Sequence, residues 1–351
     1  MYTRRPRNEK ELQLDICINE DVCPWQSTGF DRYFFVHEAL PEIDRDEVDV
    51  TTEFLGKKLR APIMIAPMTG GFETAAKINR HLAQAAQELG VAMSVGSQKI
   101  AIEKPEQAAT FQVRDVAPDI LLFANVGAVQ LNYGYGVEKM QQVVDMIGAD
   151  ALCLHLNPLQ EALKEEGNVN FTDLAEKIAV IAQELSVPVF VREVCNGISP
   201  RTAELLIRAG VAGIDVGGAG GTSWMIVEGL IAKDENRQRI AESFQNFGIP
   251  TAQSLVNVRS LSKTLPLIAT GGVRSGKDVA KSLALGANLT GIAAPLLKPA
   301  LVSPEKVIRE LMRVIEELEI LLFCLGKRNL AEFRADENVL HEYIALAPHQ
   351  G

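Results

Sequence analysis

The sequence lacks an excess of basic residues. Its 45 aspartates and glutamates outnumber its 35 lysines and arginines, so its formal net charge is -10 at pH 7. Proteins that bind nucleic acid or anionic membranes generally carry clustered positive charge. We therefore expect neither a nucleic acid nor a membrane as a partner, and any anionic ligand must be held by donors within one site.

Long apolar runs and paired cysteines are also missing. No stretch approaches the roughly 20 apolar residues of a membrane-spanning helix, and the polar, arginine-rich residues 1–10 lack the apolar centre of a secretory signal. The five cysteines are scattered, with no C-x-x-C pair: Cys17, Cys23, Cys153, Cys195 and Cys324. This pattern favours reduced thiols over a disulfide framework or a metal site, and we expect a cytoplasmic protein.

From residue 61 onward, the sequence repeats one pattern of a short apolar run, a Gly-rich or polar stop, and an amphipathic stretch. The low polarity of the runs suits parallel strands buried on both faces, and the stretches between them have apolar residues at helical spacing. Eight such units favour an α/β fold of the (β/α)8 TIM barrel type over an open doubly wound sheet. The predicted strands are residues 62–66, 92–95, 120–124, 151–156, 187–191, 213–216, 266–269 and 289–293.

No linker or low-complexity tract divides the chain, so we expect one barrel with additions. We predict an N-terminal extension and arm over residues 1–60, the barrel over 61–330, and a C-terminal tail over 331–351. Residues 223–261 exceed what one crossover helix needs, which predicts a helical insertion after the sixth strand that partly covers the barrel mouth. A chain with 47% hydrophobic and 23% charged residues can bury such a core.

Two Gly-rich loops follow the sixth and seventh predicted strands, GGAGGTS at 217–223 and TGGVRSG at 270–276. Such loops let backbone N–H groups approach an anion, and the helix that follows adds a favourable dipole. Glycines that only form tight turns explain either loop alone equally well. Two loops with Thr222 and Arg274, at the barrel end where phosphate sites commonly form, favour a phosphorylated cofactor. A bulky residue in place of Gly220 should then block the backbone approach and abolish cofactor binding.

Small and amide-bearing residues end the earlier strands. The motifs PMTGG at 67–71, GSQK at 96–99 and NVG at 125–127 suit the flat ring of a flavin, with hydrogen bonds to its edge. The fourth strand ends in HLNPLQE, residues 155–161. A lone histidine on an apolar strand is usually a core residue, but Asn157, Gln160 and Glu161 beside His155 favour phosphate binding and an oxygen ligand for Mg2+.

Together these motifs resemble the type 2, FMN-dependent isopentenyl-diphosphate isomerases. The resemblance extends from about residue 16 to the final predicted helix, and its most specific parts are HLNPLQE at 155–161 and GAGGTSW at 218–224. It implies a redox-neutral shift of the double bond of isopentenyl diphosphate to give dimethylallyl diphosphate. It also implies reduced FMN as acid/base cofactor, Mg2+, NADPH as the reductant that primes the flavin, and a homo-oligomer, either a tetramer or an octamer.

The resemblance also implies roles for individual residues. Gln160 is the expected catalytic residue near the substrate, Glu228 a proton relay, and Glu161 the metal ligand. The implied substrate-binding residues are Lys10, Ser97, Gln98, Lys99, His155, Asn157 and Gln160. The implied FMN-binding residues are Pro67, Met68, Thr69, Ser97, Asn125, Arg192, Thr222, Gly272, Val273, Arg274, Ala293 and Ala294.

The chain departs from the family pattern mainly near its start. The family has an Arg-Lys pair followed by a histidine, all of which hold the diphosphate, and the ungapped positions here are Glu9, Lys10 and Gln13. Lys99 and Arg192 stand where the family has an arginine and a lysine, which are not interchangeable at a bidentate site. Each lost charge-assisted hydrogen bond costs ~1.5–3 kcal/mol. Unless Arg4, Arg5 or Arg7 substitutes, we expect weaker substrate binding.

Two alternatives to the isomerase remain open on these residues. One is a divergent FMN-dependent paralogue that acts on another isoprenoid-like substrate, and the other is a non-catalytic flavin or isoprenoid sensor. A sensor would be expected to lose Gln160 or Glu161, and both are present. In a working isomerase with a drifted arm, Glu9→Arg with Gln13→His should lower the KM for isopentenyl diphosphate with little change in kcat.

Overall fold

The computed structural model describes residues 8–343, and eight parallel strands form a closed barrel within them. Each strand pairs with the next along the chain, and the last pairs with the first. The strands are β4 (Ile63–Ile65), β5 (Ala92–Ser94), β6 (Leu122–Gly127), β7 (Ala151–Leu156), β8 (Val189–Glu193), β9 (Gly213–Asp215), β10 (Leu267–Ala269) and β11 (Leu289–Ile292). The predicted TIM barrel is confirmed, and every predicted strand overlaps an observed one.

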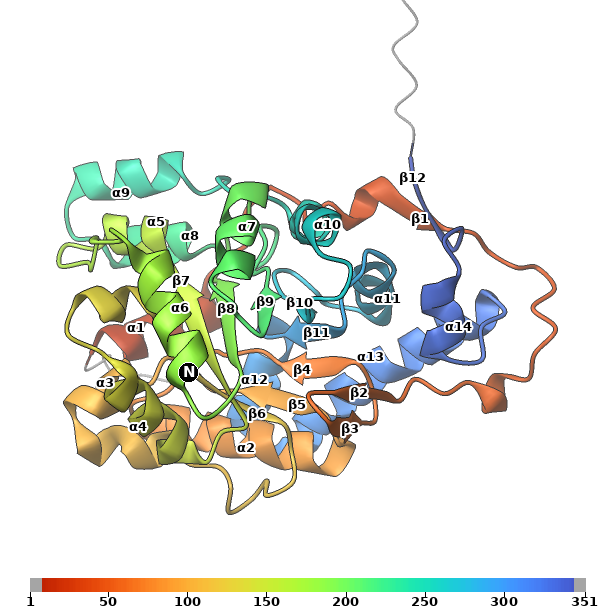
Figure 1. Cartoon of the computed structure of the whole chain (residues 1–351), viewed down its shortest axis with the longest axis horizontal. Coiled ribbons are helices and arrows are strands. Elements are labelled where there is room, and N and C mark those ends of the chain that lie inside the picture. Colours follow the sequence, from red (N-terminus) through yellow and green to blue (C-terminus); the bar gives the residue numbers. More distant parts are fainter. Residues whose placement is uncertain (1–7, 344–351) are drawn as a thin grey trace, which may run out of the picture.

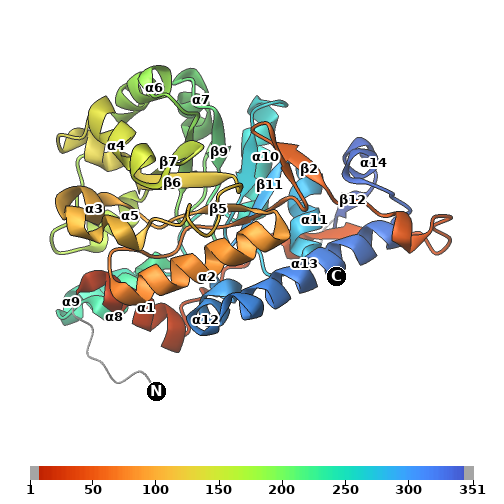
Figure 2. The same ribbon diagram turned by 90° about the horizontal axis from the view of Figure 1, so that it is seen from below.

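Helices surround the barrel (Figures 1 and 2). In α2 the apolar residues Ile78, Leu82, Ala86 and Leu89 recur at helical spacing and are buried, and Gly90 ends the helix in the left-handed conformation. Within residues 8–343, no helix is both long enough and apolar enough to cross a membrane. The helices that follow the first five barrel strands are α2 (Glu73–Leu89), α3 (Lys99–Glu103), α4 (Val137–Ile147), α5 (Pro158–Leu163), α6 (Leu174–Glu184) and α7 (Pro200–Arg208). Helix α11 (Gly276–Ala284) follows β10, and α12 (Ala294–Val302) and the closing helix α13 (Pro304–Cys324) follow β11.

The lower half of the barrel interior is apolar. Side chains alternate along the strands, so Cys153 and Phe190 belong to the inner cluster while their neighbours pack outward against the helices. A hairpin of β2 (Thr52–Phe54) and β3 (Lys57–Leu59) closes this end, where the rings of Phe54 and Phe190 lie 5.9 Å apart. The barrel is therefore a packed core at its amino end, and a site can open only at the other end.

The same alternation places polar side chains at the carboxyl end of the barrel. His155 on β7 pairs in register with Arg192 on β8, and Arg192 pairs with Asp215 on β9. His155 and Arg192 lie two residues after Cys153 and Phe190 of the inner apolar cluster, so their side chains face the same barrel interior. Chain order and register thus form a polar ring where barrel enzymes carry their active sites.

The insertion after the sixth barrel strand is helical, as predicted. It comprises α8 (Trp224–Ile231) and α9 (Glu235–Ser243), and the chain then continues into α10 (Thr251–Leu261) before β10. Helix α8 packs against α5, the short helix that follows β7. This contact brings two helices from different βα units together at the barrel mouth.

The first described helix also lies at the mouth. Helix α1 (Glu9–Asn19) begins at Asn8, whose side chain accepts a hydrogen bond from the Glu11 amide, and it packs against α8 and α12 (Figure 2). Leu14 and Ile16 are its buried residues.

The rest of the extension runs to the far side of the molecule, where a projection stands away from the barrel (Figure 1). There β1 (Tyr33–Phe35) pairs antiparallel with β12 (Leu340–Glu342), next to α14 (Leu330–Ala335), so segments near both ends of the chain meet.

Candidate active site

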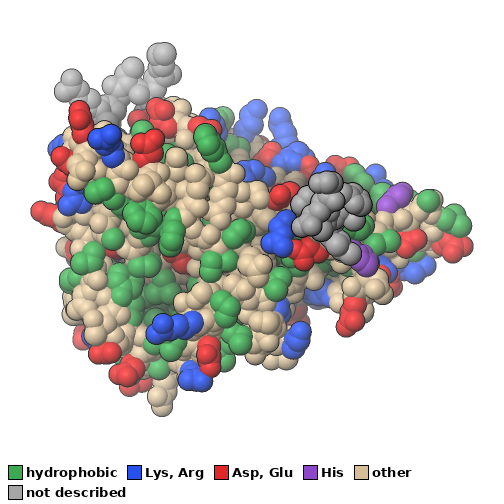
Figure 3. Space-filling model, turned by 90° about the horizontal axis from the view of Figure 1, so that it is seen from above, with side chains coloured by type: hydrophobic (Ala, Val, Ile, Leu, Met, Phe, Trp, Pro, Cys, Tyr) green, Lys and Arg blue, Asp and Glu red, His purple; other side chains and the backbone are tan. Residues whose placement is uncertain are grey.

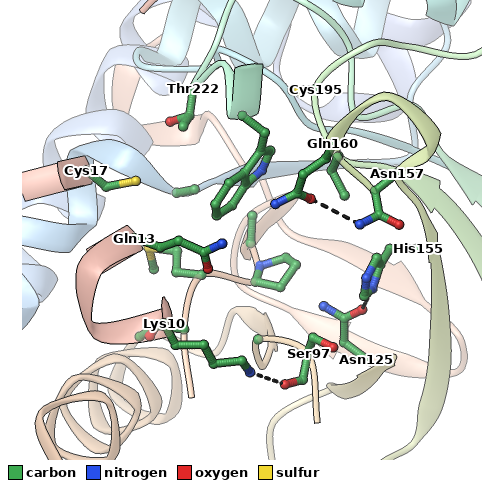
Figure 4. Close-up of a pocket in the computed structure, with 18 of the residues that line it drawn as sticks. Lys10, Gln13, Cys17, Ser97, Asn125, His155, Asn157, Gln160, Cys195 and Thr222 are labelled. Carbon is green, nitrogen blue, oxygen red and sulfur yellow. Dashed lines mark hydrogen bonds between the residues drawn. The ribbon is translucent and has the colours of Figure 1, made fainter. Parts of the chain in front are cut away.

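One cavity of about 810 Å³ opens at the carboxyl end of the barrel, within the usual size range of cofactor and substrate sites. It brings together almost all the residues singled out from the sequence, from α1, six strand ends and both Gly-rich loops, and Figure 4 shows several of them around the cavity. The expected substrate residues on its wall are Lys10, Ser97, Lys99, His155, Asn157 and Gln160, with the expected metal ligand Glu161. The expected FMN residues there are Pro67, Met68, Thr69, Ser97, Asn125, Arg192, Thr222, Gly272, Val273, Arg274, Ala293 and Ala294.

Gln98 lies elsewhere, although we expected it to bind substrate. Its side chain is fully buried behind the cavity wall, where Nε2 donates to the Val143 carbonyl at 2.8 Å and Oε1 accepts from the Asn125 amide at 2.9 Å. Both ends of the amide are therefore used inside the protein. Gln98 ties β6 to α4 and positions Asn125, so the structure does not place it with the substrate residues.

An amide–carboxylate network holds Gln160 in the cavity. Its Nε2 donates to Glu228 Oε1 at 2.8 Å, and its Oε1 accepts from Asn157 Nδ2 at 3.1 Å. Glu228 does not line the cavity, but stands directly behind Gln160 and also accepts from Gln13 Nε2 at 3.2 Å. Burial raises the pKa of Glu228, while Lys164 opposes this effect. The network forms because α5, which carries Gln160, packs on α8, which carries Glu228.

His155 is held as a neutral imidazole. Asn125 Nδ2 donates to the Val95 carbonyl at 3.1 Å, so Asn125 Oδ1 must be the acceptor that lies 2.9 Å from His155 Nδ1. The hydrogen is thus assigned to Nδ1. Burial, followed by the charges of Arg192, Lys164 and Lys10, lowers the pKa of His155 to about 3. A bound anion would act in the opposite direction and favour the protonated ring.

Arg192 forms a buried ion pair inside the barrel. Its Nε lies 3.4 Å from Asp215 Oδ2, and Thr270 Oγ1 donates to Asp215 Oδ1 at 2.5 Å. Burial raises the pKa of Asp215, against the pull of Arg192. A buried pair of this kind contributes little net stability, because desolvation offsets much of its attraction. Asp215 holds the Arg192 guanidinium in place, so a positive charge lies on the cavity wall where a flavin ring is expected.

Three lysines stand around one end of the cavity. Lys10 Nζ donates to the Ser97 carbonyl at 2.7 Å (Figure 4), and burial, followed by the charge of Lys164, lowers its pKa to about 8. Lys164 was not singled out from the sequence, because it lies outside the HLNPLQE motif. Its Nζ lies 3.1 Å from Glu9 Oε1, so the carboxylate that stands where the family has an arginine is paired. Arg4, Arg5 and Arg7 lie outside the described residues.

The two Gly-rich loops pack backbone against backbone. A Cβ atom on Gly221 would lie 2.5 Å from the Gly272 amide nitrogen, and Gly272 itself has a φ of +76°. These glycines let the loops meet and line the cavity together. Gly220 is not among the residues that line the cavity, and a Cβ atom on it would lie 2.3 Å from the Thr28 amide nitrogen. Gly220 accommodates the N-terminal segment.

The residues fit a magnesium ion only in part. Within residues 8–343, no group of three or more His, Cys, Asp or Glu side chains is placed to hold a metal. Glu161 accepts from Asn157 Nδ2 at 2.9 Å and from the Asn168 amide at 2.7 Å, while Asn157 Oδ1 is buried without a hydrogen-bond partner. Mg2+ commonly uses one or two protein oxygens together with substrate phosphates. This donor set fits a metal that arrives with a diphosphate.

Sequence comparison identifies the family. The FMN-dependent dehydrogenase family matches residues 18–118 and 137–340. An isopentenyl-diphosphate delta-isomerase from Nostoc sp. is 49% identical, over 93% of this chain and 94% of that protein. The chain belongs to the isopentenyl-diphosphate delta-isomerases. Another isomerase of that name, from Rickettsia felis, is 46% identical over 95% of this chain and 99% of that one.

Solved structures agree on the fold. A flavocytochrome b2 variant with pyruvate bound superposes with a TM-score of 0.68 at 17% identity, covering 94% of this chain and 82% of that one. A mandelate oxidase variant with an FMN adduct has a TM-score of 0.62, also at 17% identity, over 98% and 94% of the two chains. At this identity the likeness concerns architecture alone. The isomerase chain therefore shares its fold with this mandelate oxidase and this flavocytochrome b2.

Proposed function

We propose that this protein isomerises isopentenyl diphosphate to dimethylallyl diphosphate with reduced FMN. The observation that carries the proposal is the hydrogen-bonded set of Gln160, Asn157 and Glu228, of which Gln160 and Asn157 line a cavity that is also lined by the predicted FMN residues. The test is anaerobic incubation with isopentenyl diphosphate, FMN, Mg2+ and dithionite, followed by product analysis. Conversion to dimethylallyl diphosphate is expected.

The reaction needs a dry and oriented site. An unactivated alkene is a very weak base, so a proton donor must be pressed against the double bond where water is excluded and a tertiary cation is stabilised. When bound, reduced FMN supplies the acid/base group for this proton transfer. Gln160 presents an amide whose orientation is set from both ends, and Glu228 behind it can hold a proton because burial raises its pKa.

The diphosphate would be held at the end of the cavity that carries Lys10, Lys99 and His155, with Ser97 and Asn157 beside them. Glu161 would bind Mg2+ jointly with the phosphate oxygens. For FMN, the loops after β9 and β10 together with Ala293 and Ala294, at the start of α12, would hold the phosphate. Met68, Thr69, Asn125 and Arg192 would surround the ring.

The proposal extends to the surroundings of the reaction. NADPH is the proposed reductant, and the cytoplasm is the proposed location, which the five free thiols support. The proposed assembly is a homo-oligomer, a tetramer or an octamer. We also retain the division into a substrate-contacting arm (residues 1–60), an FMN-binding barrel (61–330) and a C-terminal tail (331–351).

One observation favours a second candidate, a divergent FMN-dependent paralogue that acts on another isoprenoid-like substrate. Glu9 and Gln13 occupy the arm positions where the family carries cationic diphosphate ligands, and both are tied to protein partners. A paralogue should show almost no isomerisation even at saturating isopentenyl diphosphate, while Gln160→Ala should still abolish its own reaction. The sensor alternative lacks such support, because Gln160 and Glu161 are both present and lie on the cavity wall.

A further inference from the structure

Lys164 is a cation of the cavity wall to which no motif assigns a role. It stands at the end of α5, where its backbone amide donates to the Glu161 carbonyl. Its Nζ lies 3.1 Å from Glu9 Oε1 and 3.5 Å from Glu161 Oε1. The side chain is 23% exposed, and the exposed part faces the cavity. Lys164 therefore joins the arm helix α1 to the expected metal ligand.

Lys164 belongs to a cluster of like charges. Lys10, Lys99 and Lys164 line the same cavity, and Lys164 and Lys99 both depress the pKa of Lys10. Three carboxylates lie beside these lysines: Glu9 and Glu161 next to Lys164, and Glu103 next to Lys99. Three ammonium groups therefore meet at one cavity end in a chain of net charge -10. Ammonium groups that can leave their carboxylate partners suit a ligand that carries several negative charges in a small volume.

Glu9 is the weaker partner of this arrangement. Its side chain is 55% exposed, so the attraction between Glu9 and Lys164 is screened by water. A diphosphate carries more negative charge than one carboxylate, so it can compete with Glu9 for the Lys164 ammonium.

We propose that Lys164 is a ligand of the substrate diphosphate and exchanges its ion pair with Glu9 for the diphosphate when substrate binds. This assignment rests on the proposed function. It explains how the chain retains a cationic diphosphate site although Glu9 and Gln13 occupy the arm positions of an arginine and a histidine. The cation comes from the barrel rim instead of the arm.

A different role for Lys164 would be structural, as a latch that holds α1 against the barrel through Glu9. The two roles predict opposite effects for one substitution. If Lys164 binds diphosphate, Glu9→Gln frees the ammonium and removes a competing negative charge, so diphosphate binds more tightly. If the pair is a latch, Glu9→Gln breaks it as Lys164→Met does, and both variants bind more weakly.

The experiment compares wild type, Lys164→Met and Glu9→Gln as FMN-loaded proteins. Methionine keeps much of the side-chain length without the charge. Steady-state kinetics with isopentenyl diphosphate give KM and kcat, and calorimetry gives the Kd of inorganic diphosphate in the presence of Mg2+. We expect Lys164→Met to raise both KM and Kd by about 10- to 100-fold, with kcat changed less than threefold. Glu9→Gln should lower both constants severalfold.

Lys263→Met is the matched control, because Lys263 is exposed in the loop between α10 and β10, at the opposite end of the barrel. It removes the same charge and should leave both constants unchanged. The FMN affinity and Tm of Lys164→Met should stay at wild-type values. The assignment is overturned if Lys164→Met changes KM and Kd less than twofold, or if Glu9→Gln weakens diphosphate binding.

Failure of the proposed function would look different. A wild-type protein that binds inorganic diphosphate through Lys164 but does not isomerise isopentenyl diphosphate refutes the isomerase and supports the diphosphate ligand. An active isomerase whose diphosphate affinity is unchanged in Lys164→Met supports the isomerase and refutes the assignment of Lys164 as a diphosphate ligand.

Discussion

At the scale of single residues, Gln160 is constrained at both ends of its amide. Glu228 accepts from Nε2 and Asn157 donates to Oε1, so the amide cannot flip without breaking two hydrogen bonds. An amide fixed in this way directs the same face toward the substrate in every turnover, and preorganised polar groups of this kind stabilise developing charge most effectively.

Gln160→Ala should therefore lower kcat for isopentenyl diphosphate by about 100-fold or more. The KM should change little, because the diphosphate contacts remain, and FMN should still bind. Single-turnover kinetics of the FMN-loaded, dithionite-reduced protein would measure the effect. Gln112→Ala, at an exposed position whose amide donates to the Met146 carbonyl, is the control. A kcat within threefold of wild type would remove Gln160 from the catalytic role.

The activity should depend on pH through the charge of Lys10. Its pKa of about 8 means that the ammonium is present below pH 8 and is lost as the pH rises above it. Because kcat/KM reports the free enzyme, kcat/KM for isopentenyl diphosphate should fall about tenfold per pH unit above pH 8. Lys10→Arg should remove this decline, since a guanidinium stays charged. An identical alkaline decline in both proteins would show that another group titrates.

At the scale of elements, the loop after β9 and the loop after β10 act as one unit. They meet at Gly221 and Gly272, where the backbones approach too closely for any side chain. Thr251 Oγ1, at the start of α10, adds a hydrogen bond to the Gly271 carbonyl at 2.6 Å. The phosphate site expected at these loops therefore depends on how they pack against each other.

Gly221→Val should force these loops apart and raise the Kd for FMN by more than tenfold. Fluorescence titration of the apoprotein would measure it, and circular dichroism should show the barrel retained. Gly134→Ala is a useful control, because nothing lies within 4 Å of its Cβ position, although its φ of +82° costs some stability. Unaltered FMN affinity in Gly221→Val would place the cofactor phosphate elsewhere.

The arm is the other element that matters for function. Helix α1 lies against α8 and α12, so Lys10 and Gln13 reach the cavity although the nearest barrel strand begins more than 40 residues later. Gly220 accommodates the adjoining segment at Thr28. Docking of the arm and shaping of the loop after β9 are thus coupled through one glycine.

At the scale of the whole molecule, a chain of net charge -10 has several lysines and arginines on the wall of its cavity. The outer surface also leaves large apolar side chains exposed, including Trp25 at 93% and Phe247 at 58%. The residues next to them in the chain are in contact, since the Gln26 backbone amide donates to Asn246 Oδ1 at 3.2 Å. Figure 3 shows apolar side chains spread among polar ones over the left and middle of the face that is seen from above.

We predict that the protein is a homo-oligomer in solution. Apolar surface of this kind is commonly buried in an assembly, and the resemblance to the family points the same way. Light scattering at micromolar concentration should give a multiple of the 38.3 kDa chain mass, with four or eight copies expected. A monomeric mass under these conditions would contradict the prediction.

Much of the fold and family followed from the sequence alone. Parallel strands buried on both faces appear as short apolar runs between amphipathic helices, so eight such runs predicted the barrel. The HLNPLQE and GAGGTSW strings are specific enough to indicate the chemistry, and the barrel rule placed them at one end. These features are local in sequence, so they can be recognised without knowledge of the fold.

Only the tertiary structure decided which side chains meet. Gln98 turned away to bind Val143, Gly220 packed on Thr28, Glu228 took its place behind Gln160, and Lys164 paired with Glu9. Each of these contacts joins residues 45 to 192 positions apart in the chain. They depend on strand register and on how α1, α5 and α8 pack at the mouth. Neither can be recognised from the residues nearby in sequence.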